Sequence, residues 1–114
     1  MNKKKEKAEP LPLTESTFLI LLSLTEPLHG YGIMQRIESL SSGRVKMGPG
    51  TLYGGLKALM EKKMIQRVNS GHDEENRKKM YALTELGRST LESEYMRMRQ
   101  LTEVSKDILK RGKS

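Results

Sequence analysis

The chain of 114 residues carries a net charge of +7, is 35% hydrophobic and contains no cysteine, which excludes disulfides and thiolate metal sites. Its length suits one domain with a modest core, and its distributed positive charge favours a polyanionic partner. Because no apolar run is long enough to span a bilayer and no signal-peptide pattern is present, we expect a cytoplasmic protein without a membrane partner.

The first segment, residues 1–12, is charged, aperiodic and rich in proline at its end, which predicts a flexible basic arm. Such an arm either lies along a nucleic acid or only keeps the chain soluble. Thr14 is then expected to cap a first helix, in which nearly every residue from Phe18 to Leu24 is apolar. A helix that is apolar on all sides is buried among several neighbours, and Pro27 ends it.

A second, short helix is expected after a turn at Gly30 and Gly32. Its apolar residues repeat at helical spacing from Ile33 to Leu40. The run Ser41-Ser42-Gly43 is typical of a helix end.

A third helix is expected to begin near Gly50 and to bury the face that carries Leu52, Leu56 and Leu59. Its opposite face is almost bare, although glycine inside a helix costs about 1 kcal/mol relative to alanine. A bare face and a free helix N-terminus suit entry into the major groove of DNA. The candidate DNA-contacting residues are Gly50, Thr51, Tyr53, Gly54 and Lys57. The alternative is that the glycines allow close helix packing inside the protein.

Two short strands are predicted at residues 65–70 and 78–84, joined by a polar, mobile loop at residues 71–77. Cations at the start of the second strand and before the third helix are able to contact the DNA backbone. These candidates are Lys46, Arg77, Lys78 and Lys79. The alternative is an ordinary solvated strand end.

Thr84 is expected to cap a long last helix over residues 84–110. Its apolar residues recur three or four positions apart and form one stripe between charged faces. A stripe that outlasts its own domain favours pairing with a second helix, so we predict a homodimer. The stripe consists of Leu91, Tyr95, Met98, Leu101, Val104 and Ile108.

Three helices, a β-hairpin and a long helix indicate a mostly α fold with a hairpin wing, the winged helix-turn-helix class. The expected division is an arm at 1–12, a DNA-binding domain at 13–83, a dimerisation helix at 84–110 and a flexible tail at 111–114. The chain shows no catalytic constellation or Walker motif, and its two histidines lack partners at metal-ligand spacing. We therefore expect no enzyme, no metal and no cofactor.

Four segments resemble the PadR-like transcriptional regulators, and the resemblance covers about residues 13–109. They are LTESTFLILLSL, PLHGYGIMQRIE, GRVKMGPGTLYGGLKALMEKKMI and RKKMYALTELGR. The resemblance implies a dimeric repressor of the family's short branch that reads a palindromic operator in double-stranded DNA with its third helix. One departure is Met80, where the family often has a second aromatic residue.

The resemblance also raises the question of an effector. Some relatives bind flat aromatic compounds at the dimer interface, against a tryptophan. This chain has no tryptophan, so a small aromatic effector would rest on Tyr95 and Met96, with Met98 near them. The alternative function is a winged-helix module that binds protein partners without reading DNA sequence; salt-dependent DNA binding separates the two.

Overall fold

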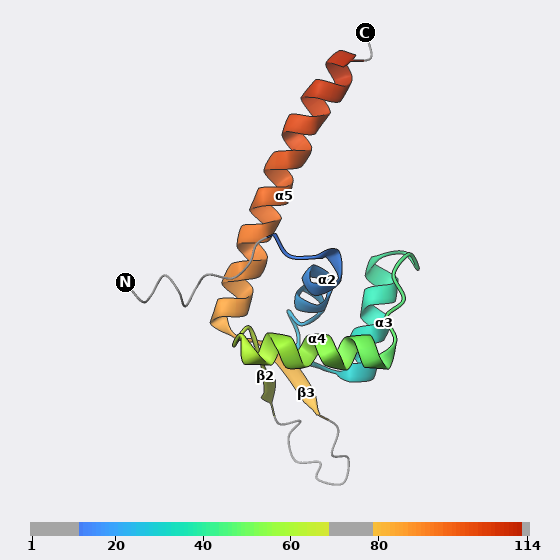
Figure 1. The fold of residues 1–114 in the computed structure, drawn as a ribbon, viewed down its shortest axis with the longest axis vertical. Coiled ribbons are helices and arrows are strands. Elements are labelled where there is room, and N and C mark those ends of the chain that lie inside the picture. The colour runs from blue at the N-terminus through green and yellow to red at the C-terminus, as the bar shows by residue number, and fades with distance from the viewer. Residues whose placement is uncertain (1–11, 69–78, 113–114) are drawn as a thin grey trace, which may run out of the picture.

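The computed structural model describes residues 12–68 and 79–112 (Figure 1). Its elements in chain order are α2 (Glu15–Ser23), β1 (Leu28–His29), α3 (Gly30–Leu40), α4 (Pro49–Glu61), β2 (Ile65–Val68), β3 (Met80–Leu83) and α5 (Glu85–Gly112). In Figure 1, α4 lies across the lower part of the domain beside α2 and α3, and α5 rises away from it. The expected mostly α fold with a hairpin and a long last helix is confirmed.

The first helix begins where the sequence predicts. The hydroxyl oxygen of Thr14 accepts a hydrogen bond from the amide of Thr17 at 3.1 Å, which satisfies one of the free donors of the first turn. The helix ends at Ser23, with Leu24 at its C-cap. Pro27, which was expected to end the helix, lies four residues beyond Ser23, so the helix is already complete before the proline.

The strand β1 was not expected from the sequence. Leu28 pairs with Tyr81 and His29 pairs with Met80 in an antiparallel ladder, so the sheet order is β1-β3-β2. Two residues are too short to show strand alternation. Because β1 leads directly into α3, that helix begins at Gly30, and the predicted turn at this position is wrong.

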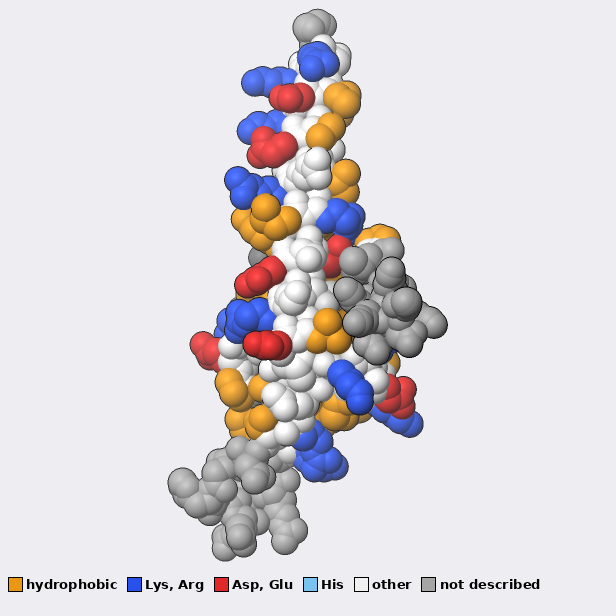
Figure 2. Space-filling view, turned by 90° about the vertical axis from the view of Figure 1, so that its left-hand side faces the viewer, with side chains coloured by type: hydrophobic (Ala, Val, Ile, Leu, Met, Phe, Trp, Pro, Cys, Tyr) orange, Lys and Arg blue, Asp and Glu red, His pale blue; other side chains and the backbone are white. Residues whose placement is uncertain are grey.

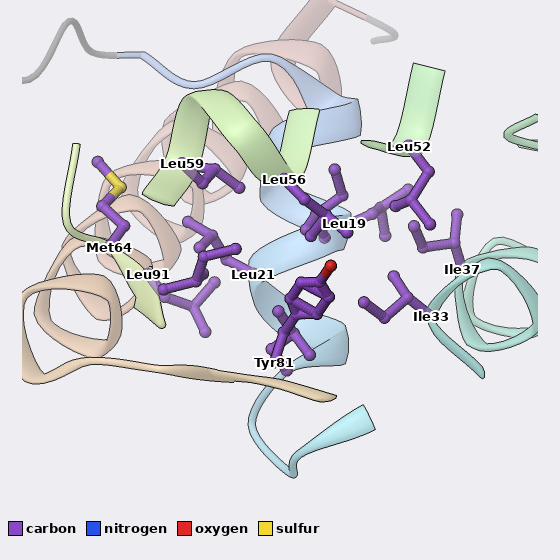
Figure 3. Close-up of a cluster of buried hydrophobic side chains, with 13 residues drawn as sticks. Leu19, Leu21, Ile33, Ile37, Leu52, Leu56, Leu59, Met64, Tyr81 and Leu91 are labelled. Atoms are coloured by element: carbon purple, nitrogen blue, oxygen red, sulfur yellow. The ribbon is translucent and has the colours of Figure 1, made fainter. Parts of the chain in front are cut away.

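The hydrophobic core lies between α2, α3, α4, the sheet and the first turns of α5 (Figure 3). Its buried members come from every one of these elements except β1. They are Leu19, Ile20, Leu21, Leu24, Ile33, Ile37, Leu52, Leu56, Leu59, Met64, Ile65, Tyr81 and Leu91. Leu91 is only 6% exposed, so it packs in this core and does not belong to the exposed part of the predicted stripe.

The long helix α5 is continuous with the domain rather than separate from it. Gly87, Thr90 and Glu94 are buried against the other elements, so the predicted division between residues 83 and 84 separates a strand from a helix within one packed body. The helix also reaches Gly112, two residues into the predicted tail. Across the described ranges, the helices lack the combination of length and apolarity that crossing a membrane requires.

Candidate nucleic-acid interface

The helix α4 presents one buried and one open face. Leu52, Leu56 and Leu59 are almost completely buried in the core. The exposed side carries small and polar residues along its length: Gly50, Thr51, Tyr53, Gly54, Lys57, Ala58 and Glu61. The apolar spacing read from the sequence therefore assigns the two faces correctly.

The glycines of α4 divide between two roles. A Cβ atom added to Gly50 or Gly54 would meet no other atom within 4 Å. A Cβ atom on Gly55 would lie 3.1 Å from Cδ1 of Ile20 in α2, which is tighter than ordinary van der Waals contact. Close packing between helices explains why residue 55 is a glycine. Gly50 and Gly54 lie on the exposed side of α4, where packing does not require a glycine.

The N-terminus of α4 is built from the sequence Gly-Pro-Gly. Gly48 is the N-cap and Pro49 occupies the first helical position, where its missing N–H costs nothing. The first intrahelical bond runs from the amide of Leu52 to the carbonyl oxygen of Gly48 at 2.9 Å. The N–H groups of Gly50 and Thr51 lie ahead of this bond, at the positive end of the helix dipole, where an anion is favoured.

Tyr53 lies on the exposed face of α4, but its side chain also contacts the start of α3. Its side chain is 47% exposed, yet its hydroxyl oxygen lies only 2.0 Å from where a Cβ atom on Gly30 would stand. Tyr53 also acts on Tyr81, whose pKa is raised first by burial and then by Tyr53. The ring is thus seated on the start of α3, close to the core of the sheet.

The cations predicted to flank the helix have different surroundings. Lys46 lies 3.9 Å from a carboxylate oxygen of Glu38, and both side chains are more than half exposed, so this pair is weak. Lys79 is exposed just before β3. Arg77 and Lys78 lie outside the described residues, as does the predicted loop at 71–77.

Sequence reasoning missed one cation on the hairpin. Arg67 is exposed on β2 and stands opposite Tyr81 in the β2–β3 ladder. A basic residue within a strand next to the predicted loop was the available signal. Figure 1 places α4 and the β2–β3 hairpin at one end of the molecule, while the C-terminal end of α5 lies at the other.

Beyond its first turns, α5 exposes apolar side chains on one side. Figure 2 shows them mostly along one edge of the helix, with most of its charged side chains along the opposite edge. Met98 is half-buried, and the apolar side chains at least 47% exposed on this side are Tyr95, Leu101, Val104, Ile108 and Leu109. Met96, which is 55% exposed, lies instead among the charged residues Arg99 and Glu103. The sequence missed Leu109, although its position eleven residues after Met98 places it on nearly the same side of a helix.

A buried carboxylate lies at the base of this exposed stripe. Glu94 is 1% exposed, and its carboxylate accepts hydrogen bonds from Arg97 at 2.6 and 3.1 Å and from the amide of Leu13 at 2.7 Å. The bond from Arg97 is the largest of the causes that hold the pKa of Glu94 below its usual range. This contact fastens the chain before α2 onto α5.

Two hollows lie along α5, and each contains a methionine that the sequence analysis placed near an effector. Met96 lines a shallow hollow of about 500 Å³ with Arg97 and Gln100, and Tyr95 is not part of its wall. A second cavity of about 470 Å³ lies between α2 and α5, where Phe18, Leu19 and Met98 form apolar walls. Of these two hollows, the one beside Met98 therefore has the more apolar lining.

Comparison with known families and sequences gives one family. The model described as the transcriptional regulator PadR-like family matches residues 18–93. An uncharacterized 37.1 kDa protein of transposon TN4556 from Streptomyces fradiae is 37% identical over 89 residues, covering 77% of this chain and 24% of that protein. The transcriptional regulator YqjI of Escherichia coli is 35% identical over 75 residues, covering 66% of this chain and 34% of that protein.

Solved structures show the same fold. A PadR-like transcription factor from Bacteroides fragilis has a TM-score of 0.68 and 24% identity, covering 94% of this chain and 96% of that chain. Bacillus subtilis PadR, solved in complex with operator DNA, has a TM-score of 0.61 and 25% identity, covering 72% of this chain and 47% of that chain. The matched family is one of transcriptional regulators, which agrees with the function class read from the sequence.

Proposed function

The chain belongs to the PadR-like family of transcriptional regulators, and from this premise we propose that it is a homodimeric repressor that reads a palindromic operator with α4. The observation that carries the proposal is the open face of α4, on which Gly50 and Gly54 present no side-chain bulk. A repressor of this kind acts where the genome lies, so the proposal includes a cytoplasmic location.

The bare face suits a groove because it brings the helix backbone close to the base edges. The major groove is about 12 Å wide and admits one α-helix. With Gly50 and Gly54 facing the groove floor, Thr51 is placed to donate a hydrogen bond and Lys57 to reach a phosphate or a guanine edge. Glu61 lies one turn farther along the same helix, away from the phosphates.

The backbone contacts of the proposal come from the ends of neighbouring elements. Lys46 precedes α4, and Lys79 precedes β3, while Arg77 and Lys78 join them on the evidence of sequence alone. Arg67 adds a further exposed cation on β2. Such contacts fix the protein on the duplex without reading sequence, and they make binding weaker as salt rises.

The dimer of the proposal forms through the exposed side of α5. Tyr95, Leu101, Val104 and Ile108 are each about half exposed in a single subunit, and apolar side chains at this spacing are usually covered by a partner helix. A two-fold axis between paired α5 helices would give each subunit one half-site. The two copies of α4 then enter grooves about 34 Å apart.

We also propose that a small aromatic compound relieves repression. The support is the apolar cavity of about 470 Å³ lined by Phe18, Leu19 and Met98, which borders the exposed stripe of α5. Bound there, a flat ring would alter how α5 meets its partner. Titration of a panel of phenolic and polycyclic compounds against the protein–DNA complex tests this, and an unchanged dissociation constant across the panel contradicts it.

Selection from randomised duplex DNA tests the function itself. Purified protein is mixed with the pool and excess nonspecific competitor at near-physiological salt, and bound duplexes are sequenced. Enrichment of an inverted repeat with half-sites about one helical turn apart supports the repressor. If no sequence is enriched and the protein shows no salt-dependent binding to DNA, the result contradicts the proposal and favours a module that binds proteins.

A further inference from the structure

Tyr53 touches the backbone of another helix at a position where only glycine fits. Its hydroxyl oxygen, Cζ and Cε1 lie 2.0, 2.7 and 3.2 Å from the point where a Cβ atom on Gly30 would stand. Real Cβ atoms essentially never come within 3.0 Å of another heavy atom. Any side chain at Gly30 therefore displaces the Tyr53 ring.

Gly30, the residue that the Tyr53 ring rests on, is linked to the β-hairpin through β1. Gly30 is the first residue of α3 and directly follows β1, whose Leu28 pairs with Tyr81 of β3. Tyr81 is buried in the core and stands opposite Arg67 of β2. Tyr53 of α4 thus lies against the first residue of α3 and close to Tyr81 of the hairpin.

We infer that Tyr53 is a positioning residue: its ring, seated on Gly30, holds the start of α4 in a fixed relation to α3 and the β2–β3 hairpin. The sequence instead suggests a hydrogen-bond donor to DNA. A rigid relation between these parts matters because the groove contacts of α4 and the backbone contacts of the hairpin must fit one duplex at the same time. This consequence for DNA rests on the proposed function, whereas the seat itself does not.

The Tyr53 ring is exposed on one side, so it is free to move outward when a side chain is added at Gly30. Tyr53 is 47% exposed, and the clashing hydroxyl is the far end of a side chain that rotates. Alanine at Gly30 therefore pushes the ring out onto the open side of α4 and leaves the fold intact. The displaced ring stands near the bare surface of Gly50 and Gly54, where the duplex is proposed to lie.

A double-mutant cycle separates the seat from other effects. The variants are Gly30→Ala, Tyr53→Ala and the two combined, with Tyr53→Phe as the conservative variant that keeps the ring and removes only the hydroxyl. Gly32→Ala is the matched control, because it lies in the same turn of α3 and its Cβ would meet nothing closer than 3.4 Å. Each is measured for melting temperature, for amide exchange in β2 and β3, and for affinity to the selected duplex.

We expect Gly30→Ala to lower the melting temperature and to speed amide exchange in the hairpin only when Tyr53 is present. Affinity for the selected duplex should fall at least about tenfold in Gly30→Ala and in Tyr53→Ala, and no further in the double variant. Gly32→Ala should stay within about twofold of the wild type.

Two results overturn the inference. One is a Gly30→Ala effect on melting and exchange that is the same with and without Tyr53. The other is a loss of affinity in Tyr53→Phe as large as in Tyr53→Ala while its melting temperature and hairpin exchange stay those of the wild type, since that assigns the effect to the hydroxyl as a DNA contact. The melting temperature and amide exchange are measured without DNA. A wild-type protein that binds no duplex would therefore contradict the proposed function, while the double-mutant cycle would still show whether Tyr53 is held by Gly30.

Discussion

The main-chain carbonyl oxygen of Met64 lies 2.0 Å from the point where a Cβ atom on Gly87 would stand. The first turn of α5 therefore rests directly on the backbone that follows α4. Thr84 completes the joint: its hydroxyl donates to the carbonyl oxygen of Lys63 at 2.7 Å and accepts from the amide of Gly87 at 3.1 Å. Its own amide donates to the carbonyl oxygen of Met64 at 3.0 Å.

This contact predicts that Gly87→Ala is destabilising. The atom that clashes is backbone and is not free to rotate away, so α5 must shift. We expect a loss of about 2–3 kcal/mol in the free energy of unfolding, measured by urea denaturation. Gly54→Ala is the control, since its Cβ meets open space and alanine is favoured in a helix by up to about 1 kcal/mol. Equal stability of the two variants would contradict the joint.

In contrast to Gly87→Ala, a change of Lys63 to glycine is expected to stabilise the fold. Lys63 directly follows Lys62, the C-cap of α4, and has a φ of 62°, a left-handed conformation that costs a residue with a Cβ about 1 kcal/mol. Lys63→Gly should raise the free energy of unfolding by about 0.4–1 kcal/mol, whereas Lys62→Gly, at a φ of −88°, should not. Chemical denaturation of both variants at one salt concentration compares them at the same change in charge.

The buried Glu94 predicts acid sensitivity. Its pKa is lower in the folded protein than in the unfolded chain, chiefly because of Arg97. The unfolded chain therefore binds more protons in acid, and stability present at neutral pH is lost as pH falls below about 4.3. Urea midpoints at a series of pH values should show a shallower acid loss in Glu94→Gln than in the wild type.

Glu15→Gln is the matched control for this titration. Hydrogen bonding to Arg44 also lowers the pKa of Glu15, but both partners are more than half exposed, so solvent screens their attraction. Its acid profile should stay close to that of the wild type. If the two variants lose acid sensitivity equally, burial of Glu94 is not the cause.

The open face of α4 predicts a functional defect without a folding defect. Gly54→Glu adds bulk and negative charge where the duplex is proposed to lie, so affinity for the selected DNA should be lost while the melting temperature is kept. Gly54→Lys adds similar bulk with the opposite charge and should lose specificity while keeping salt-dependent nonspecific binding. Specific affinity retained in Gly54→Glu would show that this face does not enter the groove.

The exposed stripe of α5 predicts that a charge in its centre dissociates the dimer. Leu101→Lys places an ammonium group among Val104 and Ile108, where burial by a partner helix would desolvate it. Sedimentation velocity should then show a monomer at concentrations where the wild type is a dimer. Gln100→Lys adds the same charge on a different face and should leave the dimer unchanged. A monomeric wild type would contradict the proposed pairing.

Much of the fold could be read from local patterns. The cap at Thr14, the buried face of α4 and the long last helix were all visible, because caps and apolar periodicity depend on residues close together in sequence. The strand β1 was not visible, since its two residues form a strand only by pairing with β3. The turn expected at Gly30 was wrong for the same reason.

The candidate site divides in the same way. The sequence by itself determined that α4 has an apolar face and an opposite face with little bulk, and that α5 carries an apolar stripe. Only the tertiary structure decided that Gly55 packs on Ile20 while Gly54 is open, and that Leu91 is core while Leu101 is exposed. The reason is that periodicity orients a side chain around its own helix axis, whereas burial depends on which other segment lies against it.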